Sequence, residues 1–325
     1  MNPSRMSRRR TLQIIAASAA AALSPGLSLA ARPTRWEWSG TALGAEANII
    51  LLHPDARLVR EAFAAAQNEI ARLENEFSLF RIDSALSRLN RAGRLAHPSL
   101  DMRRLLDEAL RVAAATDGAF DPTVQPLWEL YAGHFARHPG DTVGPSPQAV
   151  AAARLSVGWR RVGVGAAAIT LAPGTRLTLN GIAQGYITDR VADLLRGFGF
   201  ERLLLDLGEA RALGGPWSVA AREFGVDGNP FRLPLTDCAL AVSAPSGTVF
   251  EPSGRWHHLF DARTGAPARS WRAVAVRAAD ATAADVLSTA LAAAPRDRAA
   301  DIARAGGALE IWLLDDIKTI NRLTG

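Results

Sequence analysis

Apolar residues follow two patterns along the chain: a helical spacing in some segments and short continuous runs in others. A stripe of apolar residues, spaced four and three apart, predicts a helix with one buried face: Val59, Phe63, Ala66, Ile70, Leu73 and Phe77. A second helix runs through Leu105, Leu106, Ala109 and Val112. Ser99 and Asp101 can cap its start, and Gly118 follows its last turn. Two further helices are expected, at Ile187 to Leu195 and at about Thr282 to Ala293.

Short apolar runs predict the strands. They lie at Asn48 to Leu52, Ala168 to Leu171, Leu203 to Leu207, Trp217 to Ala221, Ala239 to Ser243 and Ala273 to Val276. Groups of strands with helices between the groups favour an α+β or mixed α/β core, without the regular spacing of a doubly wound sheet. A stretch rich in Pro, Gly and Ser, His138 to Pro147, separates the front third from the rest. It is either a surface loop or a subdomain boundary.

The first thirty residues have the pattern of an export signal. Arg8 and Arg9 precede a short apolar run from Ile14 to Leu23, and a small-residue site ends at Ala30. The paired arginines indicate the twin-arginine route, so residues 1–30 are the expected signal and the mature protein is expected in the periplasm. The alternative is a retained signal that tethers the protein, although the run is shorter than the roughly 20 residues that span a membrane.

Composition and charge exclude some functions. The 325 residues are 48% hydrophobic and 21% charged, which is typical of a globular protein. Four arginines lie within the signal, so its removal lowers the net charge from +5 to +1. The rest of the chain has no basic stripe with interleaved aromatics, and no nucleic-acid partner is expected. The single cysteine, Cys238, lies in an apolar run and is interpreted as a buried thiol.

The segment NGIAQGYITDR, residues 180–190, looks like the entrance to a nucleotide site. Two glycines four residues apart, Gly181 and Gly185, precede a helix. The pattern is not GxGxxG, and no acidic residue follows at the distance that a ribose contact needs, so a nicotinamide site is not expected.

Two loops contain polar residues in specific surroundings. In TDGAFDPTV, residues 116–124, backbone amides and Asp121 can hold a ligand, although alone the segment fits a capped turn better. HHLFDARTG, residues 257–265, places an imidazole three residues before a carboxylate. A histidine beside an apolar pair is more often a core residue than a site residue.

The segment AADVLSTA, residues 283–290, has a helical composition. Asp285 and Thr289 would therefore lie on one helix face. Their oxygens are hard ligands suited to Mg²⁺, which proteins hold through one or two carboxylates, water and substrate phosphates. In isolation, the pair would more often be an ordinary surface carboxylate and threonine.

Taken in order, these segments resemble the ApbE flavin transferases (FAD:protein FMN transferases). The resemblance begins at Thr41 to Gly44 and continues through FSLFRIDSALSRLN, TDGAFDPTV, GIAQGYITDRVADLL, ALAVSAPSG, HHLFDARTG and ADVLSTA. It implies a single transferase domain over residues 31–325, with an α+β fold related to the T-fold, a mixed sheet core and flanking helices. It also implies the transfer of FMN from FAD to a threonine hydroxyl of an exported or membrane protein, with release of AMP. Some members serve the maturation of membrane redox complexes.

The resemblance also assigns roles to individual residues. Mg²⁺ would be held by the Gly181 carbonyl, Asp285 and Thr289, and His258 would lie near the reacting phosphate. Phosphoryl transfer needs chiefly positioning and charge neutralisation, and a nearby base removes the proton of the acceptor hydroxyl. Flavin contacts are expected from Leu43, Phe80, Ala119, Phe120, Asp121, Leu259 and Ser288.

The chain departs from the family pattern at positions beside the ligand. Thr178 stands in the place of an aspartate and Gln184 in the place of a lysine, so the two can replace a charged pair by a neutral hydrogen bond. Phe80 replaces a tyrosine, Leu43 a methionine and Glu209 the second of two glycines. The alternative function is therefore an accessory protein that holds or delivers FAD without transfer. A third hypothesis is a periplasmic solute-binding module, but it does not explain why Asp285 and Thr289 share one helix face.

Overall fold

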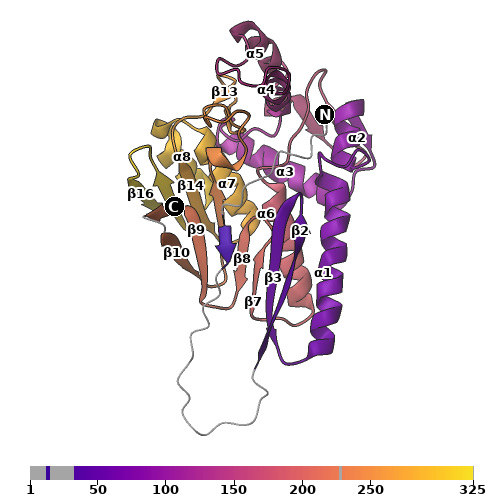
Figure 1. Ribbon diagram of the computed structural model, residues 1–325. Helices are drawn as coiled ribbons and strands as arrows, with labels where there is room; N and C mark the ends of the chain where they lie inside the picture. Colours follow the sequence, from indigo (N-terminus) through magenta and orange to yellow (C-terminus); the bar gives the residue numbers. More distant parts are fainter. Residues whose placement is uncertain (1–11, 15–32, 227–228, 325) are drawn as a thin grey trace.

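The main sheet has eight strands and is antiparallel throughout. The computed structural model describes residues 12–14, 33–226 and 229–324, and its strands follow the order β16-β15-β14-β11-β8-β7-β3-β2 (Figure 1). The strands are β2 (Thr34–Ala42), β3 (Ala45–His53), β7 (Leu203–Asp206), β8 (Ala210–Leu213), β11 (Ala239–Ser243), β14 (Ala273–Ala278), β15 (Glu310–Leu314) and β16 (Ile320–Thr324). The α+β prediction is confirmed.

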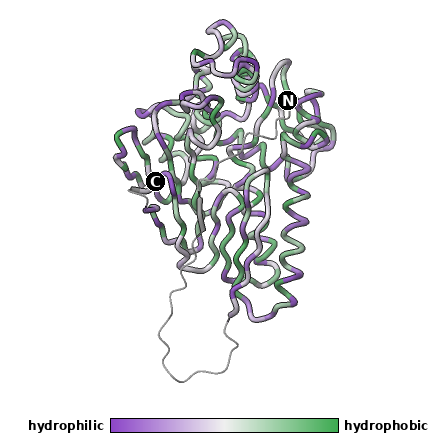
Figure 2. The backbone as a smooth tube through the Cα atoms, in the orientation of Figure 1, coloured by the Kyte–Doolittle hydropathy of each residue, from purple (hydrophilic) through white to green (hydrophobic). Residues whose placement is uncertain are grey.

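Both faces of the middle strands are covered, which explains why β3, β7, β11 and β14 have apolar runs. Ile49 and Leu205 pack toward the helices, whereas their neighbours Ile50 and Leu204 pack toward the hairpin of β9 (Trp217–Val226) and β10 (Asn229–Leu235). Successive side chains of a strand point to opposite faces, so each strand contributes to two cores. Hydrophobic colour follows the middle strands and alternates with hydrophilic colour along α1 (Figure 2).

All four predicted helices are present, and the caps of α3 (Leu100–Ala115) explain where that helix begins and ends. In α1 (Ala56–Phe77) all but one of the predicted stripe are buried, and Phe63 is partly buried. In α3 Ser99 is the N-cap, whereas Asp101 lies in the first turn. The helix ends before Gly118, whose N–H bonds the Ala113 carbonyl at 2.8 Å. The other two are α6 (Ala183–Gly197), longer than predicted, and α7 (Ala281–Ala293).

The structure contains further elements that the sequence patterns did not indicate. They include α2 (Ala85–Ala92), α4 (Gln125–Arg137), α5 (Pro147–Arg154), α8 (Ala299–Gly306), β4 (Arg94–Ala96), β5 (Val162–Val164), β12 (Phe260–Asp261) and β13 (Ala266–Pro267). The strands β2, β8, β10, β15 and β16 were not predicted either. The predicted strand β6 (Ala168–Leu171) pairs with β4 and β5. The Pro/Gly/Ser-rich stretch is the loop that joins α4 to α5, so it is not a subdomain boundary.

The predicted export signal lies outside the described residues, with one exception. Leu12–Ile14 form strand β1, which pairs antiparallel with β9. Among the described residues, no helix combines the length and apolar character that crossing a bilayer requires. Cys238 is a free, buried thiol directly before β11.

Candidate active site

A pocket lies where the motifs of the sequence converge. It encloses about 200 Å³, less than the roughly 300–1,000 Å³ of sites that take a drug-sized ligand whole, so a dinucleotide would extend through its open mouth. Its lining includes eleven of the thirteen candidate residues: Phe80, Ala119, Phe120, Asp121, Thr178, Gly181, Gln184, His258, Leu259, Asp285 and Thr289. Leu43 and Ser288 are not among the lining residues.

The glycine segment before α6 is shaped by its contact with α7. A Cβ on Gly185 would lie 2.2 Å from the Ala281 carbonyl oxygen, and one on Gly181 would lie 2.8 Å from the Thr289 hydroxyl. Only glycine lets the two helices approach this closely. The glycines therefore position α7, which carries Asp285 and Thr289.

Asp189 fixes the same contact from one turn further along α6. Its carboxylate accepts the N–H groups of Ala281 at 2.9 Å and Thr282 at 2.8 Å, and the Thr282 hydroxyl at 2.6 Å. These are orphan donors at the N-terminus of α7, where a negative charge is favourable. The sequence analysis missed this role, because nothing in the local pattern shows that Asp189 meets another helix.

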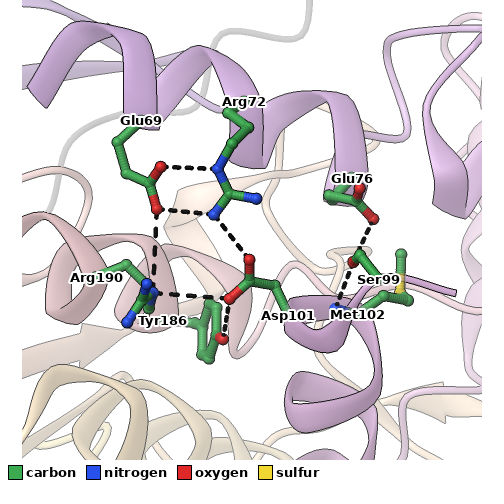
Figure 3. Close-up of polar contacts among 8 residues, drawn as sticks. All are labelled: Glu69, Arg72, Glu76, Ser99, Asp101, Met102, Tyr186 and Arg190. Carbon is green, nitrogen blue, oxygen red and sulfur yellow. Dashed lines mark hydrogen bonds and ion pairs between the residues drawn. The ribbon is translucent and has the colours of Figure 1, made fainter. Parts of the chain in front are cut away.

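A second set of polar contacts ties the first turns of α6 to α1 and α3 (Figure 3). Arg72 of α1 donates to Asp101 of α3 at 2.7 Å, and Tyr186 of α6 donates to the same carboxylate at 2.7 Å. Arg190 lies 3.6 Å from Asp101 and 4.0 Å from Glu69, which also accepts from Arg72. The start of α6 is thus held on one side by this network and on the other by α7.

Asp285, Thr289 and Gly181 present the oxygens expected of a magnesium site. The Asp285 carboxylate is 3% exposed, and its Oδ2 accepts the N–H of Gly185 at 3.0 Å. In a regular helix that N–H would bond the Gly181 carbonyl four residues earlier. No backbone N–H bonds that carbonyl in the described part of the chain, so its oxygen is available to a cation. The donor set, one carboxylate, one hydroxyl and one carbonyl, fits Mg²⁺.

The described residues contain no group of three or more His, Cys, Asp or Glu side chains arranged to hold a metal. This excludes from that part of the chain the kind of site that zinc prefers. The result is compatible with a hard cation such as Mg²⁺, which is bound by few protein ligands together with phosphate and water.

The two adjacent histidines have different environments. His257 is 3% exposed, and burial lowers its pKa to about 4, so it is a neutral core residue. His258 lines the pocket, and its Nδ1 bonds the Thr248 carbonyl at 3.0 Å. A carbonyl only accepts, so Nδ1 carries the hydrogen and Nε2 is the basic nitrogen. The core interpretation therefore holds for His257 and not for His258.

The loop that contains Asp121 lines the pocket, but its carboxylate serves the loop itself. Oδ1 accepts from the backbone and the hydroxyl of Thr123 at 2.8 and 2.6 Å, and Oδ2 accepts from the N–H of Trp159 at 3.0 Å. Burial raises the pKa of Asp121. The capped-turn interpretation is thus correct for the side chain, while Ala119 and Phe120 extend the lining.

The remaining candidates for flavin contacts differ in their exposure to the pocket. Phe80 is 61% exposed at the pocket and presents its ring as a stacking platform. Leu43 is buried, and its N–H donates to Glu74 at 2.6 Å. Ser288 is also buried, and its hydroxyl bonds that of Ser243, a lining residue, at 2.7 Å. Ser288 therefore supports the lining through Ser243, whereas Leu43 is held by Glu74, which does not line the pocket.

Thr178 and Gln184 both line the pocket, but they do not replace a charged pair by a bond to each other. The Thr178 hydroxyl accepts the N–H of Asn180 at 3.3 Å. The Gln184 amide instead packs on Gly208, where an added Cβ would lie 2.2 Å from its nitrogen. The expectation of a Thr178 to Gln184 hydrogen bond was wrong, because Gln184 fills the space over the turn between β7 and β8.

Glu209 on that same turn is a site residue whose role the sequence analysis did not assign. It lines the pocket and is 6% exposed. Burial raises its pKa well above the usual value, and the nearby charges of Asp285 and Asp206 add to the effect. The only signal in the sequence was a charged residue where the family pattern has glycine.

The charges of the pocket lining are all of one sign. Asp121, Glu209 and Asp285 contribute carboxyl groups, and none of the lining residues in the described part of the chain is lysine or arginine. A phosphate within this pocket would therefore meet no lysine or arginine of the lining.

A second hollow, of about 490 Å³, opens beside α5. It is lined mainly by proline and apolar residues, and its one carboxylate, Asp261, is bonded by Arg263 at 3.1 Å. It holds neither a histidine nor the oxygens of α7, so we place the chemistry in the first pocket.

Comparison with known proteins agrees with this geometry. The ApbE family model matches residues 43–313. The FAD:protein FMN transferase of Vibrio cholerae is 30% identical over 271 residues, which cover 78% of this chain and 79% of the relative. The transferase of Haemophilus influenzae is 29% identical over 265 residues, covering 76% and 75%.

Solved structures lead to the same family. The flavin transferase ApbE from Vibrio cholerae superposes with a TM-score of 0.76 at 25% identity, covering 90% of this chain and 97% of the other. The ApbE protein of Thermotoga maritima gives a TM-score of 0.79 at 26% identity, covering 89% and 97%. With a model match over most of its length and a relative at 30% identity, the chain belongs to the ApbE family of flavin transferases.

Proposed function

We propose that this protein transfers FMN from FAD to a threonine hydroxyl of an acceptor protein, in a reaction that needs Mg²⁺ and releases AMP. The named relatives support an FAD:protein FMN transferase. The acceptor is proposed to be exported or bound to the membrane, as part of a redox complex. The arginine pair and apolar run of residues 1–30 support a periplasmic location.

The observation that carries the metal dependence is the charge of the pocket. A pyrophosphate has two negative charges, and the lining adds Glu209 and Asp285 without any lysine or arginine among the described residues. A bound Mg²⁺ would neutralise phosphate charge and stabilise the charge that develops during transfer. Asp285, Thr289 and the Gly181 carbonyl are the residues that would hold it.

The chain's own groups account for the remaining requirements. The threonine oxygen attacks the phosphorus of the FMN half, the bond from that phosphorus to the bridging oxygen breaks, and AMP leaves with the electron pair. His258 accepts the threonine proton at Nε2, because Thr248 holds the hydrogen of the ring on Nδ1. Such a base contributes roughly 10²- to 10⁴-fold to a rate. Phe80 offers its face to an aromatic ring of FAD at the mouth.

Incubation with an acceptor tests the proposal directly. The mature protein, FAD, Mg²⁺ and an acceptor that carries a threonine flavinylation segment should give a covalently fluorescent acceptor band. A Thr→Ala acceptor is the matched control. The absence of the band, under conditions where a known FAD:protein FMN transferase labels the same acceptor, would contradict the proposal.

Thr178 and Gln184 favour a second candidate, a flavin-binding accessory protein without transfer. Neither residue supplies the charge that the family has beside the ligand. The double variant Thr178→Asp with Gln184→Lys separates the candidates. A large gain of transfer from a silent parent supports the accessory protein, whereas an active parent that changes little supports the enzyme.

A further inference from the structure

Glu209 reaches the same pocket as the proposed metal ligands from a different part of the fold. It occupies the tight turn between β7 and β8, after Gly208, whose φ of +110° lets the chain reverse. Asp285 comes from α7, on the helical side of the sheet. The two carboxylates both line the pocket and lie near enough for the charge of one to act on the other.

One carboxylate oxygen of Glu209 lacks a protein partner. The side chain is 6% exposed, and the backbone N–H of Val242 hydrogen-bonds its carboxyl group. The other oxygen, Oε2, is fully buried and has no hydrogen-bond partner within the described residues. A buried charged oxygen is costly unless an ion or a hydrogen-bond donor satisfies it.

Among the described residues that line the pocket, none is a lysine or arginine that could do so. Position 184, where the family pattern has lysine, holds a glutamine whose amide packs on Gly208, the neighbour of Glu209. Relative to the family pattern, this chain therefore lacks a positive charge at position 184 and has an additional carboxyl group at position 209. A divalent cation beside Asp285 would satisfy the buried Oε2 of Glu209, and Mg²⁺ is bound in proteins by one or two carboxylates.

We propose that Glu209 provides a second carboxylate to the divalent cation that Asp285 binds. The inference rests on the proposed function, because it assumes that the pocket holds this cation. It assigns to this chain a metal site more acidic than the single-carboxylate set of Gly181, Asp285 and Thr289.

Metal binding without FAD tests the role of Glu209 apart from activity. Free Mn²⁺, followed by electron paramagnetic resonance, is titrated with the mature protein and with the variants Glu209→Gln, Asp285→Asn and Glu310→Gln. Loss of a direct ligand should weaken binding at least as much as the roughly 10- to 100-fold that is typical for partners of ligands. We expect an increase of the Kd by about tenfold or more for Glu209→Gln and for Asp285→Asn.

Glu310→Gln is the matched control, because Glu310 is equally buried but bonded to Arg277 and Arg322 and absent from the pocket lining. It should bind Mn²⁺ as the parent does. Thermal melting adds an independent readout: Glu209→Gln should melt at a higher temperature than the parent without metal, yet gain less from added Mg²⁺.

The outcomes separate the inference from the function on which it rests. If Glu209→Gln binds Mn²⁺ within twofold of the parent while Asp285→Asn is weakened, the role of Glu209 is overturned and the metal site stands. If the parent binds no Mn²⁺, with or without FAD, the metal dependence in the proposed function is itself refuted.

Discussion

Replacement of Gly185 by alanine tests the contact between α6 and α7 that positions the proposed metal ligands. The new methyl would lie 2.2 Å from the Ala281 carbonyl oxygen, 2.6 Å from its carbonyl carbon and 2.8 Å from the Thr282 Cα. All three are backbone atoms, so no side chain can turn away. Ordinary contact begins at 3.4 Å, and the difference of 1.2 Å from the oxygen is the distance by which α6 and α7 must separate.

Two opposing effects set the size of the change. Alanine is favoured over glycine in a helix by roughly 1 kcal/mol. Overpacking in a close contact typically costs about 1–3 kcal/mol, and a clash with backbone belongs at the upper end. We therefore expect Gly185→Ala to lower the free energy of unfolding by about 1–2 kcal/mol. The Gly185 N–H that bonds Asp285 would move with the helix, so transfer activity should fall as well.

Urea denaturation of Gly185→Ala and Gly197→Ala measures the effect. Gly197 ends the same helix, and a Cβ there meets nothing within 4 Å, so its replacement should leave stability unchanged or raise it by up to about 1 kcal/mol. A Gly185→Ala protein as stable as the Gly197→Ala protein would refute the close approach of α6 and α7.

Three more predictions concern single side chains. His258→Gln should lower the rate of transfer by roughly 10²- to 10⁴-fold and leave FAD binding, measured by calorimetry, nearly unchanged. His257 has a folded pKa of about 4 against 6.5 for the unfolded chain, so its contribution is complete above pH 6.5 and is lost as the pH falls toward 4. One pKa unit corresponds to about 1.4 kcal/mol, so the free energy of unfolding of the parent should fall by about 3 kcal/mol relative to that of His257→Gln over this pH range. A difference between the two proteins that stays constant with pH would contradict this prediction. Asp189→Asn should cost about 1–2 kcal/mol of stability through the N-terminus of α7, and an unchanged thermal midpoint would show that this cap is unimportant.

Local pattern was sufficient where one element carries the whole signal. The stripe from Val59 to Phe77 specifies α1 because a helix buries residues at this spacing. Asp285 and Thr289 could be paired in advance because their spacing alone puts them on one helix face. The strand β11 was predicted with its true limits because its run is apolar on both faces.

Roles that depend on distant elements could not be predicted in the same way. The sequence around Asp189 shows a helix carboxylate, but it does not show that α7 lies beside it. In the same way, the sequence around Glu209 does not show that β8 pairs with β11. Helix α4 was not predicted from the sequence, because its aromatic residues pack with Phe250 and Phe260, which are distant in sequence. The predicted hydrogen bond between Thr178 and Gln184 was wrong because it also depended on a distant segment. The Gln184 amide packs on Gly208, which the local sequence does not show.

The most direct test of the account measures flavinylation of the acceptor by the parent and by Asp285→Ala across a Mg²⁺ series. The proposed metal lies at Asp285 and Thr289, beside the pyrophosphate. We predict that Asp285→Ala keeps its fold, binds FAD only modestly more weakly, and transfers FMN slower by orders of magnitude, because the developing phosphate charge has lost its counter-ion. Parent-like rates in Asp285→Ala, with the same dependence on Mg²⁺, would show that the metal is bound elsewhere and would contradict the account.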